Sequence, residues 1–335
     1  MTVIFSGIQP TGTKHLGNYI GAISHYVEGL EYGDPAIYCV VDLHAVTVDY
    51  DPSKLRERVY DTTAILIAAG LEPERCVLFR QGDVHEHTEL SWLLSSVVPV
   101  GELDRMHQFR DKAPGQREMA RSGLLFYPVL MAADVLAYKA HEVPVGEDQR
   151  EHLELMRDAA KRFNARFGEV LVVPEARIPK VGARIMDLQE PTRKMSTTSQ
   201  SEKGTVHVLD EPDRIRKKFR SAVTDSGAEI RRDPEKPGIS ALIEVLAAVR
   251  GVSIEEVERE FADATGYGPF KDAVADAVIE YLAPVRERYH ALRADEDALE
   301  NALEQGAEKA RAIASGTLAE VREAMGVGRP VRSRA

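Results

Sequence analysis

The sequence contains little cysteine and no long apolar run. Cys39 and Cys76 are the only cysteines in 335 residues, and both lie within short apolar runs. Two thiols cannot form a disulfide framework or a zinc cluster, so the reducing cytoplasm is the expected location. No apolar run approaches the roughly 18–20 residues that span a bilayer, and no basic stretch followed by an apolar one occurs among the first residues. Neither a membrane span nor a signal peptide is therefore expected.

Negative charge exceeds positive charge, but unevenly along the chain. The net charge of −11 argues against a general nucleic-acid binder. Residues 161–220 nevertheless contain 14 lysines and arginines against 8 aspartates and glutamates, whereas residues 251–335 contain 11 against 17. The basic stretch Arg214–Arg220 fits either a solvated helix face or a contact with RNA. An enzyme that meets one RNA briefly remains compatible with this distribution.

The first 187 residues alternate short β-branched runs with helical patterns. Strands are predicted at Val3–Phe5, Ile37–Val41, Val77–Phe79 and around Val143 and Val145. Helices are predicted at Gly17–Leu30, Pro52–Ala69, Thr88–Val97, Leu124–Leu136 and Glu147–Phe167. Strands that alternate with helices indicate right-handed crossovers between parallel strands. The fold class predicted for residues 1–187 is therefore α/β, a doubly wound parallel-sheet (Rossmann-like) nucleotide-binding domain.

After about residue 187 the strand signals fade. Helical patterns follow from Asp210, interrupted at Asp225–Gly227, Pro234–Gly238, Gly251 and Gly266–Pro269. They predict a second, all-helical domain over residues 188–294. A last helix at about 295–325 is expected to pack back on the first domain. The Gly-, Pro- and Arg-rich residues 327–335 are expected to form a flexible tail.

The segment between the first strand and the first helix is a candidate nucleotide site. It reads Ser-Gly-Ile-Gln-Pro-Thr-Gly-Thr-Lys-His-Leu-Gly-Asn over residues 6–18, at the place where a doubly wound sheet binds nucleotides. It is neither the Gly-x-Gly-x-x-Gly fingerprint nor a Walker loop. Gly17 would let a phosphate approach the backbone N–H groups of the helix, with His15 and Asn18 beside it as side-chain donors. On these residues alone, a structural and a catalytic role for His15 stay equally open.

A second polar segment, Lys194-Met195-Ser196, lies just after the point at which the strand signals fade. Alone it is typical of a flexible loop. Together, His15-Leu16-Gly17-Asn18 and Lys194-Met195-Ser196 resemble the first and second signatures of class I aminoacyl-tRNA synthetases. Six further segments resemble the bacterial tryptophanyl-tRNA synthetases: Ile-Phe-Ser-Gly-Ile-Gln-Pro-Thr-Gly at 4–12, Phe-Tyr-Pro-Val-Leu-Met-Ala-Ala-Asp at 126–134, Val-Pro-Val-Gly-Glu-Asp-Gln at 143–149, and residues 152–155, 162–164 and 221–226.

This resemblance, which extends to about residue 240, implies a tryptophan–tRNA ligase. Such an enzyme joins tryptophan to the α-phosphate of ATP, releases pyrophosphate, and passes tryptophan to the terminal adenosine of tRNA(Trp). The family works as a homodimer without membrane partners. Mg²⁺ is expected to be held mainly by ATP, with no protein metal site. Residues 188–294 would bind the anticodon.

The resemblance also implies residue roles at the ATP site. His15, Asn18, Lys194 and Lys112, the last on a loop that is mobile in the family, would act in catalysis. The ATP-binding set would be Gln9, Thr11, Gly17, Asn18, Gly146, Asp148, Ile185, Lys194, Met195 and Ser196. Within it, Asp148 suits the two hydroxyls of the ribose, and Lys194 would close over the phosphates.

An indole ring offers a large apolar body and one N–H donor. Tyr127, Met131 and Asp134 share a face of the predicted helix Leu124–Leu136, where a carboxylate alone would suggest a buried ion pair or a cap. By resemblance, Asp134 accepts the indole N–H, and Tyr127 and Gln149 hold the ammonium group. The remaining expected contacts of the tryptophan site are Phe5, Gly7, Gln9, His44, Val143 and Val145.

One position departs from the family pattern. The second signature commonly has another lysine where this chain has Thr197. Arg193, Lys112 or Lys203 would have to supply the missing positive charge, and we expect Thr197 to tune the loop without abolishing activity.

Three alternative functions remain. A tyrosine-specific synthetase is disfavoured by Met131, because the tyrosine enzymes tend to place a polar residue there, and by Gly7-Ile8-Gln9. A nucleotidyltransferase of the same superfamily is disfavoured by the helical domain and by Lys194-Met195-Ser196. An inactive tRNA-binding paralogue has only Thr197 in its favour. The pair His85 and His87 matches no metal-binding spacing, and we expect it in the loop before the helix Thr88–Val97.

Overall fold

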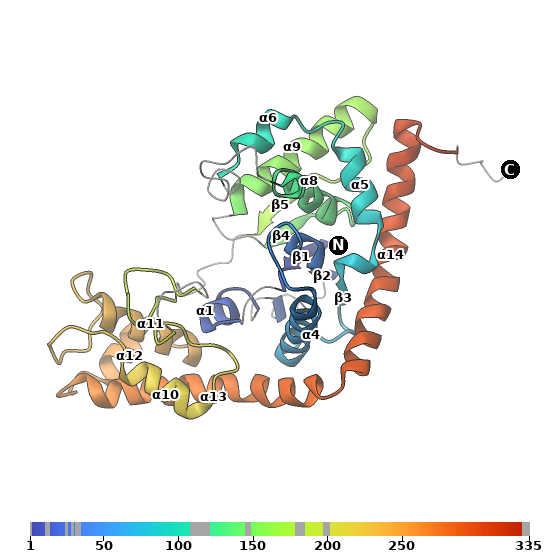
Figure 1. Cartoon of the computed structure of the whole chain (residues 1–335). Helices are drawn as coiled ribbons and strands as arrows, with labels where there is room; N and C mark the ends of the chain where they lie inside the picture. The colour runs from blue at the N-terminus through green and yellow to red at the C-terminus, as the bar shows by residue number, and fades with distance from the viewer. Residues whose placement is uncertain are drawn as a thin grey trace.

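The structure is a computed structural model that describes residues 2–10, 14–23, 26–27, 30, 35–107, 121–144, 149–177, 185–196 and 202–329. Figure 1 shows two parts: a sheet with helices around it, and a group of helices beside and below it. The expected flexible tail begins within the described residues, and its last six residues lie outside them.

A five-stranded parallel sheet forms the centre of the first part. Its strands are β1 (Ile4–Ile8), β2 (Ala36–Val40), β3 (Val77–Arg80), β4 (Glu142–Pro144) and β5 (Glu175–Arg177), in the order β3-β2-β1-β4-β5. The predicted α/β fold is confirmed. Strand β5 was not expected, because its three residues are mostly exposed and carry no apolar alternation. The strand order reverses between β1 and β4, which is where such sheets bind ligands.

Apolar side chains cover both faces of the sheet. Along β2, Ile37 and Cys39 belong to one buried cluster, and Tyr38 and Val40 to the other. This strand is buried at all five positions, as expected where helices cover both faces. The helices of this part are α1 (Leu16–Asn18, continued by a π-helix at Tyr19–Ile23), α3 (Asp42–Ala45), α4 (Pro52–Ala69), α5 (Glu86–Leu94), α6 (Val100–Arg105), α8 (Ser122–Leu136) and α9 (Arg150–Phe167).

Local sequence explains the ends of α4, and packing overrides it at α5. The Asp51 side chain accepts from the backbone N–H of Ser53 and caps α4, and Gly70 ends that helix at φ +117°. Helix α5 begins at Glu86 and not at Thr88. The expectation that His85 and His87 lie in a preceding loop is therefore wrong for His87, which is a helical residue with no exposed surface.

The second part is all-helical, as predicted. It consists of α10 (Pro212–Arg220), α11 (Pro237–Arg250), α12 (Ile254–Glu260) and the long α13 (Tyr267–Arg293), which also packs against α4. No single helix in the described residues is long and apolar enough to cross a membrane; only α11 and α12 pass that test together, and they are bent by 107°.

Helix α14 (Glu296–Met325) returns from α13 and lies along the edge strand β3 (Figure 1). Its backbone comes so close that a Cβ at Gly306 would overlap the carbonyl oxygen of Leu78 and lie 2.6 Å from its carbon. Arg80 at the end of β3 forms an ion pair of 2.7 Å with Glu300 of α14. The helix thus covers an edge strand that would otherwise expose unpaired backbone groups.

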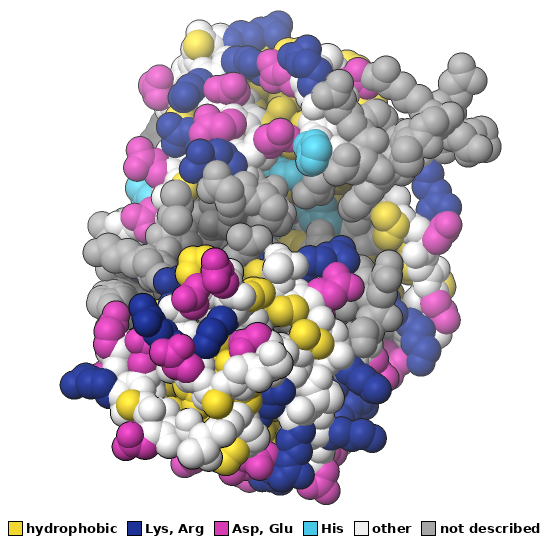
Figure 2. Space-filling view, turned by 90° about the vertical axis from the view of Figure 1, so that its left-hand side faces the viewer, with side chains coloured by type: hydrophobic (Ala, Val, Ile, Leu, Met, Phe, Trp, Pro, Cys, Tyr) yellow, Lys and Arg dark blue, Asp and Glu magenta, His cyan; other side chains and the backbone are white. Residues whose placement is uncertain are grey.

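The basic stretch of α10 is largely neutralised. Arg220 pairs with Asp272 at 2.7 Å, and Lys218, which is buried, pairs with Asp210 at 2.5 Å. Arg214 and Arg216 also have carboxylate partners, Glu202 and Asp276. Figure 2 shows basic and acidic side chains interspersed over the lower part of the molecule. These pairs fit the solvated helix face better than a free RNA contact.

Candidate active site

His15 and Asn18 lock each other at the start of α1. Asn18 donates its backbone N–H to Nδ1 of His15 at 3.2 Å, and His15 donates its backbone N–H to Oδ1 of Asn18 at 3.2 Å. This reciprocal arrangement is a capping box. Because Nδ1 accepts a hydrogen bond, the proton of the neutral ring lies on Nε2. The loop histidine therefore has both a structural role and an Nε2–H donor to offer.

The surroundings of His15 are positively charged. Burial is the main reason that the pKa of His15 falls to about 4. Positive charge on His207, Lys194 and Lys14 adds to this effect. Groups of one sign that converge on one place repel each other, and a bound anion relieves that repulsion. The start of α1 is therefore suited to a polyanion such as a triphosphate.

We expect the charge state of His15 to make the fold less stable in mild acid. Between pH 6.5 and 4 the unfolded chain binds a proton at His15 that the folded chain does not, so folding weakens as the pH falls. The contribution at pH 5 is about 2 kcal/mol relative to pH 7.5. Between pH 7.5 and pH 5 the free energy of unfolding, measured by urea denaturation, should therefore fall by about 2 kcal/mol less in His15→Gln than in the parent. Identical pH dependence in the two proteins would contradict the assignment.

The second predicted segment lies on a hairpin. Met186 and Lys194 form an antiparallel bridge, and Met195 donates its backbone N–H to the carbonyl of Ile185 at 2.9 Å. Lys194 is exposed, and no carboxylate among the described residues pairs with it. Thr205, which follows the hairpin, donates its hydroxyl to the carbonyl of Ser196 at 2.8 Å.

A short extended segment joins the two signatures, although about 180 residues separate them in the chain. Leu16 donates to the carbonyl of Val206 at 2.8 Å, and Val208 donates to the carbonyl of Lys14 at 2.9 Å. Gly17 also approaches the hairpin, since a Cβ at this position would lie 3.4 Å from Cβ of Ile185. The structure thus brings together the predicted residues His15, Gly17, Asn18 and Ile185 with the Lys194 hairpin.

Lys14 was not singled out in the sequence. Its ammonium group donates to the carbonyl of Gln9 at 2.7 Å, just past the end of β1. Burial lowers the pKa of Lys14 to about 8. A partly buried cation beside the signature histidine could have been found only from the adjacency of Lys14 and His15, which by itself is a weak signal.

Several expected tryptophan contacts lie on β1, β4 and α8. Phe5 and Val143 are buried, and Met131 is half-buried on α8. Phe5 stacks on Tyr138 with ring centroids 5.4 Å apart. A Cβ at Gly7 would lie 3.2 Å from a methyl group of Val41, so a larger residue would crowd this end of the sheet.

Asp134 is buried on α8 and accepts three short hydrogen bonds. His44 contacts Oδ2 through Nε2 at 2.7 Å, whereas Gln81 and His87 contact Oδ1 at 2.7 Å each. Burial alone would raise the pKa of Asp134, but the charge of His44 and the hydrogen bonds from both histidines reverse this and hold it well below its ordinary value. Asp134 is therefore an ionised acceptor inside an apolar helix.

Tyr127 and His44, two other expected contacts of tryptophan, have hydrogen-bond partners within the protein. The Tyr127 hydroxyl lies 2.7 Å from Nε2 of His152, and the rings of His44 and Tyr127 meet edge to face at 6.2 Å. His44 directs Nε2 at Asp134. Gln149 is the residue before α9. The predicted residues Thr11, Lys112, Val145, Gly146 and Asp148 lie outside the described residues, as does Thr197.

Like Lys14, Gln81 and His87 are site residues that sequence reasoning missed. Gln81 directly follows β3, and the carboxyl ends of parallel strands carry ligand-binding residues, so its position was a usable signal. His87 was missed because it was expected in the loop before the helix and not within the helix. Among the described residues no group of three or more His, Cys, Asp or Glu side chains could hold a metal ion.

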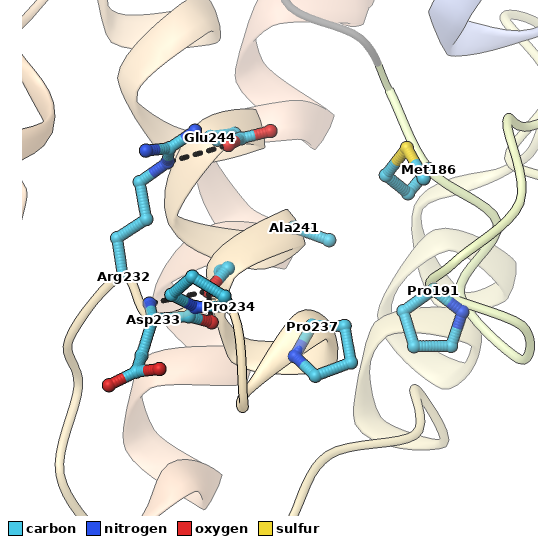
Figure 3. A pocket seen from close by; sticks show the side chains of 9 residues that line it. Met186, Pro191, Arg232, Asp233, Pro234, Pro237, Ala241 and Glu244 are labelled. Carbon is cyan, nitrogen blue, oxygen red and sulfur yellow. Dashed lines mark hydrogen bonds and ion pairs between the residues drawn. The ribbon is translucent and has the colours of Figure 1, made fainter.

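A pocket of about 360 Å³ lies between the Lys194 hairpin and α11 (Figure 3). Met186 and Pro191 of the hairpin face Pro237 and Ala241 across it, and Arg232 pairs with Glu244 at 2.8 Å at its side. None of the predicted site residues lines this pocket. It is separate from the two candidate subsites, but it shares the hairpin that carries Lys194.

Comparisons with known proteins identify the family of this chain. A family model described as tRNA synthetases class I (W and Y) matches residues 1–283. The tryptophan–tRNA ligase of Oceanobacillus iheyensis is 50% identical over 98% of this chain and 100% of its own length. A tryptophanyl-tRNA synthetase structure from Mycoplasma pneumoniae has a TM-score of 0.87 at 34% identity over 98% of both chains. One from Campylobacter jejuni, complexed with ADP and tryptophan, has a TM-score of 0.85 at 33% identity over 97% of this chain and 100% of its own. The chain therefore belongs to the class I tRNA synthetases of the tryptophan and tyrosine group, among the bacterial tryptophanyl-tRNA synthetases.

Proposed function

We propose that this chain activates tryptophan with ATP and transfers it to tRNA(Trp). The observation that carries the proposal is the presence of two subsites built by residues that follow the carboxyl ends of β1, β2 and β3. One is a cationic, donor-rich start of α1 that suits a triphosphate. The other contains a buried ionised acceptor, Asp134, that suits the single N–H of an indole. The binding of ADP and tryptophan by the Campylobacter jejuni relative supports both assignments.

In the first step a carboxylate oxygen of tryptophan attacks the α-phosphorus of ATP. A new O–P bond forms, the bond to the bridging oxygen of the β-phosphate breaks, and pyrophosphate leaves. The enzyme contributes mainly positioning and charge stabilisation to such a transfer. The Nε2–H of His15, the amide of Asn18 and the ammonium of Lys194 would bind the phosphate oxygens as charge develops on them. Thr11, Gly146, Asp148 and Lys112 keep their expected roles toward ATP.

Mg²⁺ would reach the site as its complex with ATP and neutralise part of the triphosphate charge. The residues near His15 are cationic, and a cation-rich site does not supply carboxylate ligands to a metal.

In the second step a hydroxyl of the terminal adenosine of tRNA(Trp) attacks the carbonyl carbon of the adenylate. AMP then leaves and the ester to tRNA remains.

The cation missing at Thr197 has a candidate replacement. Of the three basic residues expected to substitute, Arg193 is paired with Glu190 at 2.9 Å, Lys203 is exposed, and Lys112 lies outside the described residues. Lys14 instead brings a positive charge close to His15. This arrangement supports an active enzyme with Thr197 as a tuning residue and not an inactive paralogue.

Residues 188–294 would bind the anticodon stem, and the enzyme would act as a cytoplasmic homodimer.

Two exposed apolar side chains support the homodimer. The chain's one tryptophan, Trp92 on α5, is 72% exposed, and Val100 on the neighbouring α6 is 68% exposed. Core packing does not explain Trp92, whereas a subunit interface would cover both side chains. The free, buried thiols of Cys39 and Cys76 suit a reducing compartment. Sedimentation equilibrium should give twice the chain mass, and a monomer at micromolar concentration would contradict the dimer.

ATP–pyrophosphate exchange with tryptophan and tyrosine side by side tests the proposed activity. Exchange should depend on tryptophan and be at least about 100-fold faster with it than with tyrosine, because a phenol carries its donor at a different position from the indole N–H and its single ring fills less of an apolar pocket. Exchange with tyrosine alone would establish the tyrosine enzyme instead. A folded protein that supports exchange with neither amino acid would be the inactive paralogue.

A further inference from the structure

The carboxylate of Asp134 is held by a buried network that the expected reaction does not use. Gln81 and His87 both have no exposed surface, and their nitrogen atoms lie 2.7 Å from Oδ1. Leu43 donates its backbone N–H to Oε1 of Gln81 at 3.1 Å. This contact identifies the oxygen of the Gln81 amide, so its NH₂ group is the one that faces Asp134.

The protonation of His87 follows from its two partners. Because Nδ1 faces a carboxylate, it carries a proton and donates it. Nε2 of His87 lies 2.6 Å from the hydroxyl of Tyr138, and in the neutral ring it accepts the proton of that hydroxyl. Tyr138, His87 and Asp134 thus form a chain of donors that ends on Oδ1. Phe79 closes the network from the side, with its ring 5.8 Å from the rings of both His87 and Tyr138.

Among the described residues, the donors to Asp134 leave one of its acceptor positions unused. A carboxylate has about four acceptor positions, two on each oxygen. Oδ1 receives Gln81 and His87, whereas His44 is the one donor to Oδ2 among the described residues. The second position of Oδ2 remains for a ligand. A buried carboxylate without such donors would rotate or take up a proton, and it would then no longer be a directed acceptor.

We propose that Gln81, His87 and Tyr138 are positioning residues for tryptophan specificity, which orient Asp134 so that its remaining acceptor position meets the indole N–H. The inference rests on the proposed function, in which Asp134 binds that N–H. It assigns no chemical step to the three residues. They act through Asp134, and their effect should be confined to substrates that carry the N–H group.

The discriminating probe is β-(3-benzothienyl)-L-alanine, the tryptophan isostere in which sulfur replaces the indole N–H. In pyrophosphate exchange the parent enzyme should prefer tryptophan over this analogue by about 10- to 100-fold in kcat/KM, the effect of one hydrogen bond to a charged group. In His87→Leu this preference should fall below about threefold, because kcat/KM for tryptophan drops and that for the analogue changes little. His87→Asn, which can still donate to Oδ1, should restore part of the preference.

His85→Asn is the matched control, because His85 lies two residues away with a side chain that is 77% exposed. Its preference should equal that of the parent. Gln81→Met provides a second test should His87→Leu fail to fold, and it should lower the preference at least threefold. An equal loss of kcat/KM for both substrates in the folded variants would show a merely structural network and overturn the inference. A parent enzyme that uses tryptophan but does not distinguish it from the analogue would instead refute the role of Asp134. Absence of exchange with either substrate would refute the proposed function.

Discussion

Replacement of Lys194 by alanine is expected to lower kcat for tryptophan-dependent pyrophosphate exchange about 100- to 1,000-fold. Lys194 is exposed on its hairpin, no carboxylate in the described part of the chain neutralises it, and its charge acts on His15. Charge that develops on the phosphate oxygens in the transition state would be stabilised by this ammonium group. The loss should therefore appear in kcat more than in the KM for tryptophan, as measured by exchange at saturating ATP.

Arg193→Ala is the matched control for Lys194→Ala. Arg193 is the adjacent residue of the same hairpin and is also exposed, but Glu190 pairs with it at 2.9 Å. Its replacement should change kcat less than about threefold, since an exposed ion pair contributes little. Equal losses in the two variants would indicate a disturbed hairpin and would contradict a specific role for the Lys194 charge.

Replacement of Gly306 by alanine is expected to destabilise the fold by about 3 kcal/mol, and replacement by valine to prevent folding. A Cβ at this position would overlap the carbonyl of Leu78. Helix α14 would have to move away from β3, and the ion pair of Arg80 with Glu300 would lengthen. The loss of stability should appear in thermal unfolding followed by circular dichroism.

Gly316→Ala is the control for Gly306→Ala. It changes the same residue type on the same helix and so shows the effect of helix propensity without the close approach to β3. A Cβ at Gly316 would meet nothing within 4 Å. Gly316→Ala should therefore stabilise the protein by about 0.5–1 kcal/mol, because alanine favours the helical state. Melting temperatures of Gly306→Ala and Gly316→Ala that move in the same direction would contradict the packing of α14 on β3.

Local rules predicted those parts of the fold that depend on neighbours in sequence. Helix α4 has the predicted bounds, because Asp51 caps it and Gly70 ends it. Strand β5 and the start of α5 could not be predicted in this way. The exposed residues of β5 carry no apolar pattern, and Glu86 and His87 are helical residues whose side chains pack in the interior. At both places contacts with distant segments decide the conformation.

The candidate site was predictable to the extent that short motifs carried it. His15, Gly17, Asn18 and the Lys194 hairpin were identified as two separate segments, and the structure joins them through residues 205–208. Asp134 was identified on an apolar helix face. Its donors Gln81 and His87 come from different elements, and no periodicity within one segment reveals a hydrogen bond between two of them.

Scarce cysteine, the absence of long apolar runs and the confined positive charge were sequence properties, and the expectation of neither a membrane protein nor a general nucleic-acid binder rested on them. The sequence by itself also determined the alternation of strands and helices and the two signatures, since these depend on neighbouring residues. The tertiary structure decided what the charges and polar groups do. It pairs most of the basic stretch of α10 with carboxylates, and it surrounds Asp134 with three donors. Hydrogen bonds and ion pairs depend on distances between segments that only folding brings together.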